Sequence, residues 1–260
     1  MRLGGYNMNG TKENYIKFIE ELSFNAWPSY QSELYDDWLI GYSDFYTHRT
    51  NCVNVIGSSK LPLNEKVRYC EQEYERLNTP CIFKINPIFH ENLERYLCER
   101  EYAKEHITDT YVCDLSNITT FTNERFEVSI SDTLTKNWIM NLFHLNRTTN
   151  ESHLTIVPKM YEAIPRDIIC ACIIDHGNTI ATGLGIIERD HIGIYAIYVD
   201  EHYRRQQLAK TIVSKLLLRA KELGIHHAYL QVVHDNLIAK RVYKSIGFHP
   251  LYTYWFRVKR

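Results

Sequence analysis

The stretch "VDEHYRRQQLAKTIVSKLLLRAKELG" (Val199–Gly224) decides the fold, because it runs from the end of a strand through a basic turn into a long amphipathic segment. Apolar residues recur about every fourth position from Leu208 to Leu223, which predicts a helix of roughly four turns with one buried face. Gly224 stands where a C-terminal glycine cap belongs. The stretch therefore predicts a strand–turn–helix unit, with the helix beginning near Gln206.

The turn between strand and helix carries Arg204 and Arg205, followed by two glutamines. The first turn of a helix leaves backbone N–H groups without partners, and the positive end of the helix dipole lies there as well. Basic side chains are unfavourable at that end unless an anion is bound, and two arginines beside free amides suit a diphosphate. The turn is thus predicted to bind phosphate, whereas two solvated loop arginines are the simpler alternative.

Strands and helices alternate around this unit. In the second half, strands are predicted over 126–131, 168–175, 179–187, 192–200, 225–233 and 251–258, and helices over 132–145, 152–164 and 236–248. In the first half, we expect helices over 11–22, 62–77 and around 93–97, a hairpin or short meander over 34–59, and strands over 81–85 and 110–115. A polar stretch after residue 117 marks a soft boundary. The pattern predicts an α/β protein with a mixed sheet.

Composition limits the function classes. Thirty Lys and Arg against thirty-one Asp and Glu give a formal net charge of −1, so no global basic field favours nucleic acid or a membrane surface. Seven cysteines without CxxC pairs favour reduced thiols in a cytoplasm. His226 and His227 are adjacent and would point to opposite faces of a strand, so no metal site is predicted.

Two linked motifs carry a resemblance to the GCN5-related N-acetyltransferases (GNAT). The turn pattern of that family, Gln or Arg, two arbitrary residues, Gly, one arbitrary residue, then Gly or Ala, falls on Arg204, Gln207 and Ala209, with Gln207 in place of the first glycine. The family's downstream asparagine and tyrosine match Asn236 and Tyr243, and its small residue and Gly-Phe pair also match at the expected spacing. The close likeness covers 168–260.

The resemblance implies a division of the chain. Residues 118–260 are similar to a GNAT acyl-CoA N-acyltransferase domain, and 1–117 resemble the smaller α/β, GNAT-like N-terminal half domain of one subgroup of the family. The implied fold is a mixed α+β sheet in both parts.

The resemblance also implies a cofactor and its site. Acetyl-CoA is the expected co-substrate, its pantetheine arm lying alongside the backbone of Ile197 and Val199, with Asn236 as a further contact and, more simply, as a helix N-cap. Tyr243 is the expected general acid for the departing thiolate, with helix packing as the alternative reading. The residues expected to hold the diphosphate are Arg204, Arg205, Gln206, Gln207, Leu208, Ala209 and Lys210.

The general base is not assigned from the sequence, because the strand over 192–200 carries no acid before Asp200. Glu188 reads as a solvated turn residue, and Tyr195 could relay a proton through water. The leading function is transfer of acetyl from acetyl-CoA to a primary amine of a small molecule, peptide or protein by direct attack. The alternative is a non-catalytic acyl-CoA-binding or regulatory module with a degenerate site.

The acceptor site is expected between the two parts. The aromatic segment over 34–59 would help to wall it through Trp38, Tyr42, Tyr46 and Arg49. The sequence does not identify the acceptor amine, and a homodimer is compatible with it.

Overall fold

The computed structural model describes residues 11–260, so the first ten residues of the predicted 1–117 domain lie outside the described part. The described chain forms one mixed sheet of eleven strands with the order β1-β2-β3-β4-β11-β5-β10-β9-β8-β7-β6. The N-terminal elements are α1 (Lys12–Ala26), β1 (Gln31–Tyr35), β2 (Trp38–Tyr42), β3 (Val53–Val55), α2 (Leu63–Arg76), β4 (Cys81–Ile85), α3 (Glu91–Glu99) and β5 (Ala103–Asp114).

The C-terminal elements follow the predicted alternation closely. They are β6 (Val128–Ser131), α4 (Lys136–Asn146), α5 (Glu151–Glu162), β7 (Asp167–Asp175), β8 (Asn178–Glu188), β9 (His191–Val199), α6 (Leu208–Glu222), β10 (His227–Val233), α7 (Leu237–Ile246) and β11 (His249–Lys259). Short 3-10 helices cover His48–Thr50, Leu115–Asn117 and Glu201–Tyr203. The predicted mixed α/β sheet is confirmed.

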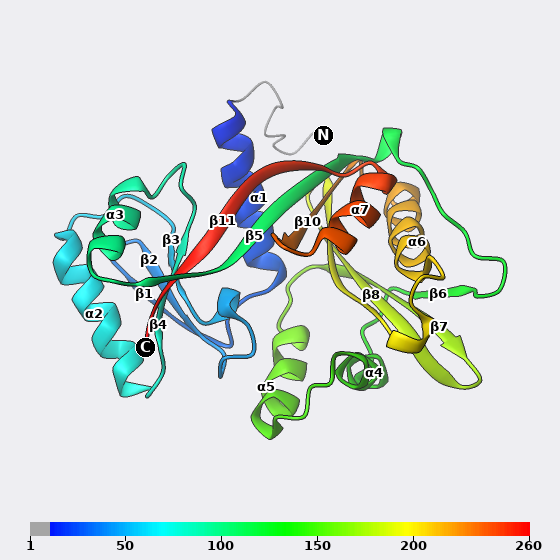
Figure 1. Cartoon of the computed structure of the whole chain (residues 1–260), viewed down its shortest axis with the longest axis horizontal. Coiled ribbons are helices and arrows are strands. Elements are labelled where there is room, and N and C mark those ends of the chain that lie inside the picture. The colour runs from blue at the N-terminus through cyan, green and yellow to red at the C-terminus, as the bar shows by residue number, and fades with distance from the viewer. Residues whose placement is uncertain (1–10) are drawn as a thin grey trace.

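Two long strands join the halves of the molecule. Figure 1 shows β11 and β5 running side by side from the α6–α7 side to the α2–α3 side, so that the C-terminus lies among N-terminal elements. The C-terminal end of β11 pairs with β4 from Trp255↔Ile85 to Lys259↔Cys81. Strand β5 pairs antiparallel with both β10 and β11. The predicted boundary at 117/118 stays a prediction, and the strands on its two sides share one sheet.

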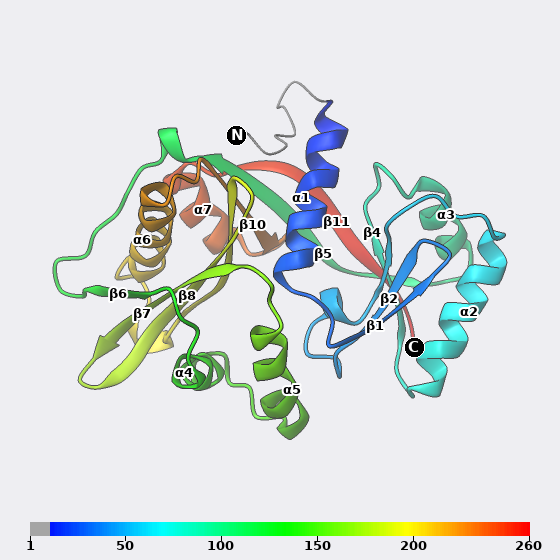
Figure 2. The same cartoon turned by 180° about the vertical axis from the view of Figure 1, so that it is seen from behind.

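Helices cover both faces of the sheet. On one face of β7–β10, α6 and α7 bury a cluster that includes Ile194, Leu208, Ile212 and Ile246. On the opposite face, α4 and α5 bury Trp138, Leu142 and Met160 against Leu184. Seen from behind in Figure 2, α1 crosses the junction between the two halves. The apolar stripes read from the sequence thus face the two sides of one sheet.

Helix α6 begins at Leu208 rather than near Gln206. The reason is local, because Gln207 has φ = +60° and Arg205 has φ = +63°, values outside the right-handed helical region. Within residues 11–260, no helix is both long enough and apolar enough to cross a bilayer.

Candidate active site

The strands β9 and β10 separate partway along their length. Their parallel pairing runs from His191↔His227 to Ile194↔Leu230 and then stops, although β10 continues and stays paired with β5 as far as Val233. Beyond that point the β10-facing edge of β9 has no strand partner among the described residues. A separation of this kind offers backbone N–H and C=O groups to an extended ligand.

A β-bulge in β9 lies where the strands separate. Thr182 faces Tyr198 and Leu184 faces Tyr195, so the single residue Gly183 of β8 stands opposite two residues of β9. One of these, Ala196, has φ = +50°, and its carbonyl accepts a hydrogen bond from Thr182 Oγ1 at 3.1 Å. The extra residue bends β9 away from β10, which is the local cause of the opening.

The turn after β9 leads directly to the start of α6. Arg204 and Arg205 are exposed, and no hydrogen bond or ion pair of either side chain occurs within the described chain. Asn123 Nδ2 donates to the Gln206 carbonyl at 2.8 Å, and Leu208 is buried in the core, so both ends of the turn are fixed. Left-handed residues beside a helix start are typical of backbone anion sites.

The other predicted cofactor residues take distinct positions. Ile197 and Val199 lie on the separated part of β9, with their side chains packed against the α6–α7 core. The Lys210 ammonium lies 4.3 Å above the centre of the Phe121 ring. Asn236 is the N-cap of α7, because its side chain accepts from the Ala239 N–H at 3.0 Å. The predicted capping role is therefore confirmed, and cofactor contacts remain predictions.

Tyr243 projects from α7 and packs against the same core as Ile197. Burial raises the pKa of its phenol to about 12, with a smaller contribution from Tyr198. The half-buried Tyr243 ring packs as expected for a helix residue, and its role as a general acid stays a prediction.

Residues of the N-terminal part meet the separated strands in a group that we call the junction cluster, namely Tyr46, Arg49, Tyr198, Gln231 and Tyr243. Arg49 Nη1 donates a hydrogen bond to Gln231 Oε1. Asn146 Nδ2 donates to the Tyr46 hydroxyl at 3.2 Å and also hydrogen-bonds Tyr198. The cluster thus connects the 3-10 helix at Arg49 with both separated strands.

Of the four residues predicted to wall the acceptor site, two lie together and two lie elsewhere, and the acceptor site itself stays a prediction. Tyr46 and Arg49 belong to the junction cluster, whereas Trp38 is 2% exposed in a separate core beneath α2. The Lys66 ammonium lies 4.1 Å above the centre of the Trp38 ring. Tyr42 is not part of the junction cluster either, and its hydroxyl donates to Asp44 Oδ1 at 3.2 Å. Side chains alternate between the two faces of β2, and the face that carries Trp38 packs against α2, which explains why Trp38 is buried there.

Neither candidate for the general base is a free carboxylate. Glu188, which the sequence suggested to be solvated, accepts from Asn25 at 3.1 Å and from Arg166 at 3.0 Å. Tyr195 donates to the Tyr229 hydroxyl at 3.0 Å. Burial raises the pKa of Tyr195 to about 12, although the positive charge of Arg49 lowers it. Glu188 is therefore already paired with the Arg166 guanidinium.

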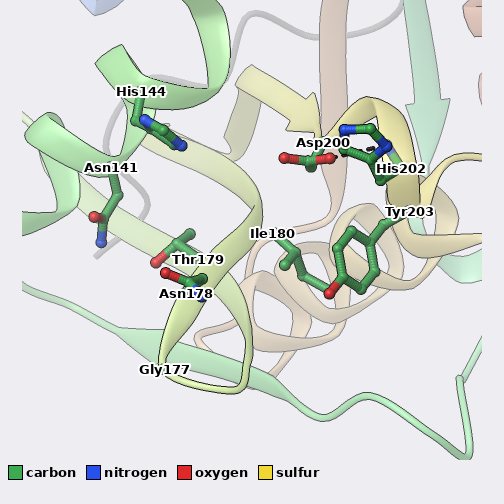
Figure 3. Close-up of a pocket in the computed structure, with 9 residues that line it drawn as sticks. All are labelled: Asn141, His144, Gly177, Asn178, Thr179, Ile180, Asp200, His202 and Tyr203. Atoms are coloured by element: carbon green, nitrogen blue, oxygen red, sulfur yellow. Dashed lines mark hydrogen bonds between the residues drawn. The ribbon is translucent and has the colours of Figure 1, made fainter.

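A polar pocket of about 390 Å³ opens beyond the C-terminal end of β9, beside the turn that leads to α6. Figure 3 shows His144 of α4 on one side of it and Asp200 and His202 on the other. Tyr203, which also lines the pocket, donates to Asp175 Oδ2 at 2.9 Å. None of the residues predicted to bind the cofactor lines this pocket.

Histidines gather at two places in the described structure. The ligand atoms of His48, Glu105 and His106 lie within 4.8 Å of one another, but Arg260 already binds both Glu105 oxygens, at 2.7 and 3.1 Å. The argument from opposite strand faces is wrong for His226 and His227, because β10 begins at His227. The prediction of no metal site stays a prediction.

The sequence analysis missed Gln231, Tyr198 and Asn146. Gln231 is an ordinary polar residue within a strand, and only the separation of β9 from β10 gives its side chain a special position. Tyr198 stands between the two residues chosen on β9, and its position in a tyrosine-rich strand was the one available signal.

Comparison with known proteins identifies similar sequences and folds. A model of the acetyltransferase (GNAT) family matches residues 137–248. An uncharacterized N-acetyltransferase of Bacillus subtilis, YobR, is 26% identical over 247 residues, which cover 94% of this chain and 99% of that protein.

Solved structures agree with this likeness at the level of the fold. A GCN5-related N-acetyltransferase from Kribbella flavida superposes with a TM-score of 0.68 at 13% identity, covering 97% of this chain and 96% of that one. A tandem GNAT protein from the clavulanic acid biosynthesis pathway gives 0.62 at 10% identity, covering 80% and 73% of the two chains. The predicted GNAT fold is confirmed.

Proposed function

We propose that this chain, whose residues 137–248 belong to the acetyltransferase (GNAT) family, transfers acetyl from acetyl-CoA to a primary amine by direct attack. The observation that carries the proposal is the separation of β9 from β10, with a phosphate-compatible turn at one end and with Tyr243 packed against the same core as Ile197 of β9. Acetyl-CoA would supply the activated acetyl group.

Binding of the co-substrate would use backbone more than side chains. The free edge of β9 at Ile197 and Val199 suits the amide groups of a pantetheine arm. The exposed arginines, Arg204 and Arg205, together with the N–H groups at the start of α6, suit its diphosphate. The left-handed conformation at Gln207 provides the backbone shape that the family's glycine favours.

Proton transfer is the step that depends on Tyr243. Attack of a neutral amine on the thioester breaks the C–S bond, and the departing thiolate takes a proton. A phenol with a pKa of about 12 is fully protonated at neutral pH and can donate that proton. The amine proton would leave to water, because no residue is assigned as the general base.

The test combines binding and turnover. In wild type we expect acetyl-CoA binding by calorimetry and acetylation of an amine, detected by mass spectrometry. Tyr243→Phe should lower kcat about 100-fold while acetyl-CoA affinity stays nearly unchanged, because the ring packing survives and the proton donor is lost.

The controls separate the two functions left open by the sequence. Replacing both Arg204 and Arg205 by alanine should weaken acetyl-CoA binding, whereas Arg95→Ala, at an exposed site on α3, should not. Binding without any turnover in wild type would favour a non-catalytic acyl-CoA module. Absence of acetyl-CoA binding in wild type would overturn the proposal.

A further inference from the structure

We propose that the acceptor carries a carboxylate beside its primary amine, and that Arg49 and Gln231 bind this carboxylate. The inference rests on the proposed function and adds a substrate class, amino acids and related amino carboxylates. It starts from a cation without an anion in the junction cluster.

Arg49 is a half-buried cation that forms no ion pair within residues 11–260. Its guanidinium donates to Gln231 Oε1 and lies 5.6 Å from the centre of the Tyr195 ring, so its charge meets a neutral amide and an aromatic face. A guanidinium has five N–H donors, and these neutral contacts leave donors free. A half-buried charge without a counter-ion is costly, which makes the position suited to a ligand anion.

Gln231 provides a second, independent sign. Its Nε2 is buried and has no hydrogen-bond partner, while the Oε1 of the same amide accepts from Arg49. An unsatisfied buried N–H group costs about 1–3 kcal/mol. A carboxylate near Arg49 would accept from the guanidinium with one oxygen and could accept from this amide with the other.

The surrounding side chains favour an anionic rather than a cationic acceptor. The hydrogen-bond partners within the cluster are neutral, because Gln231 Oε1 accepts from Arg49 and the Tyr46 hydroxyl accepts from Asn146 Nδ2 at 3.2 Å. Burial raises the pKa of Tyr198, and the positive charge of Arg49 opposes that increase. A polyamine would bring a second ammonium group into a cluster whose only charge is positive.

The position of Arg49 also fits the chemistry. Gln231 is the first residue of β10 beyond the last pair with β9, and Tyr243 packs against the same core as Ile197 and Val199 on the separated part of β9. A carboxylate bound there would place the amine of a small amino acid near the proposed proton donor. Neutralising that carboxylate also lowers the pKa of the neighbouring amine, which favours the reactive neutral form.

The test compares amines that differ only in charge. L-Lysine, L-phenylalanine, L-threonine and L-glutamate are each assayed with acetyl-CoA beside their α-carboxamides, and kcat/KM is measured for each pair. Wild type should prefer a carboxylate to its amide by about 10- to 100-fold, the range expected for hydrogen bonds to a charged group. Arg49→Gln should bring this ratio close to one.

A second variant tests the charge without removing the arginine. Gln231→Glu should pair with Arg49 and lower the same ratio, since the new carboxylate occupies the place of the ligand's. Arg68→Gln, an exposed arginine on α2, should keep the wild-type ratio, and thermal unfolding shows whether each variant is folded.

Two outcomes overturn the inference in a chain that binds acetyl-CoA: amides acetylated as well as the carboxylates, or none of the four amino acids acetylated. Absence of acetyl-CoA binding would instead overturn the proposed function, so the two failures are distinguishable.

Discussion

At the residue scale, backbone and side-chain roles are divided within the proposed site. Gln207 contributes a left-handed backbone conformation, and Tyr243 contributes a hydroxyl with an unusually high pKa. Each role depends on a property that substitution can change selectively.

The first prediction concerns the pH dependence of Tyr243. Burial raises its pKa from the usual 10 to about 12, so the proton-donating neutral form persists to higher pH than in a solvated tyrosine. We expect the ratio of kcat between wild type and Tyr243→Phe to stay constant from about pH 7 to 10. Steady-state profiles of both proteins test this, and a ratio that falls toward one near pH 10 would contradict it.

The second prediction concerns Gln207, which has φ = +60° where the family pattern has glycine. Gln207→Gly should retain acetyl-CoA affinity, because the backbone already has the conformation that glycine allows. Gln207→Val should destabilise the fold by about 1–2 kcal/mol, since a β-branched residue is strained in the left-handed region. Urea unfolding and calorimetry measure both effects, and equal stability of the two variants would argue against this account.

At the element scale, the opening between β9 and β10 depends on how α6 lies on the sheet. Gly183 of β8 stands opposite the bulge, and a Cβ there would lie 2.4 Å from Ile212 Cγ2 and 2.9 Å from Ile197 Cδ1. The absent side chain lets α6 approach the strand that carries the predicted pantetheine contacts. Helix, bulge and turn are thus fixed together.

Gly183→Ala should therefore disturb both stability and binding. Its methyl group would push Ile212 and Ile197 outward, at a cost of about 1–3 kcal/mol for an overpacked core. Acetyl-CoA affinity should fall as well, because Ile197 and the start of α6 move. Gly177→Ala in the β7–β8 turn is not a suitable control, because that glycine has a positive φ. Ala163→Gly, at the C-cap of α5 and away from α6, exchanges the same two residue types in the opposite direction. Equal losses of stability and acetyl-CoA affinity in both variants would argue against a special role for Gly183.

At the scale of the whole molecule, the two parts are joined through sheet pairing rather than by a flexible linker. Strand β5 lies between β10 and β11, and β11 reaches β4. A buried contact also crosses between the two parts, since Tyr252 of β11 donates at 2.7 Å to Glu20 of α1, a carboxylate that also forms an ion pair with Lys84 of β4.

A fragment containing only residues 118–260 should consequently fail to fold as a stable unit. It would lose β5, which lies between β10 and β11, and expose the paired edges of both strands. We expect no cooperative thermal transition by near-ultraviolet circular dichroism for the fragment, against a single cooperative transition for the full chain. A fragment with native-like cooperative melting would contradict this expectation.

Local patterns in the sequence determined the element order and the two motifs. Period and caps are short-range properties, so the α6 stripe, the Asn236 cap and the alternating strands could be predicted from neighbouring residues. Only the tertiary structure decided where β9 leaves β10, that β11 joins both halves, and which side chains meet at Arg49. These features depend on pairing between residues far apart in the chain, as between Arg49 and Gln231, and one sequence carries no local signal for such contacts.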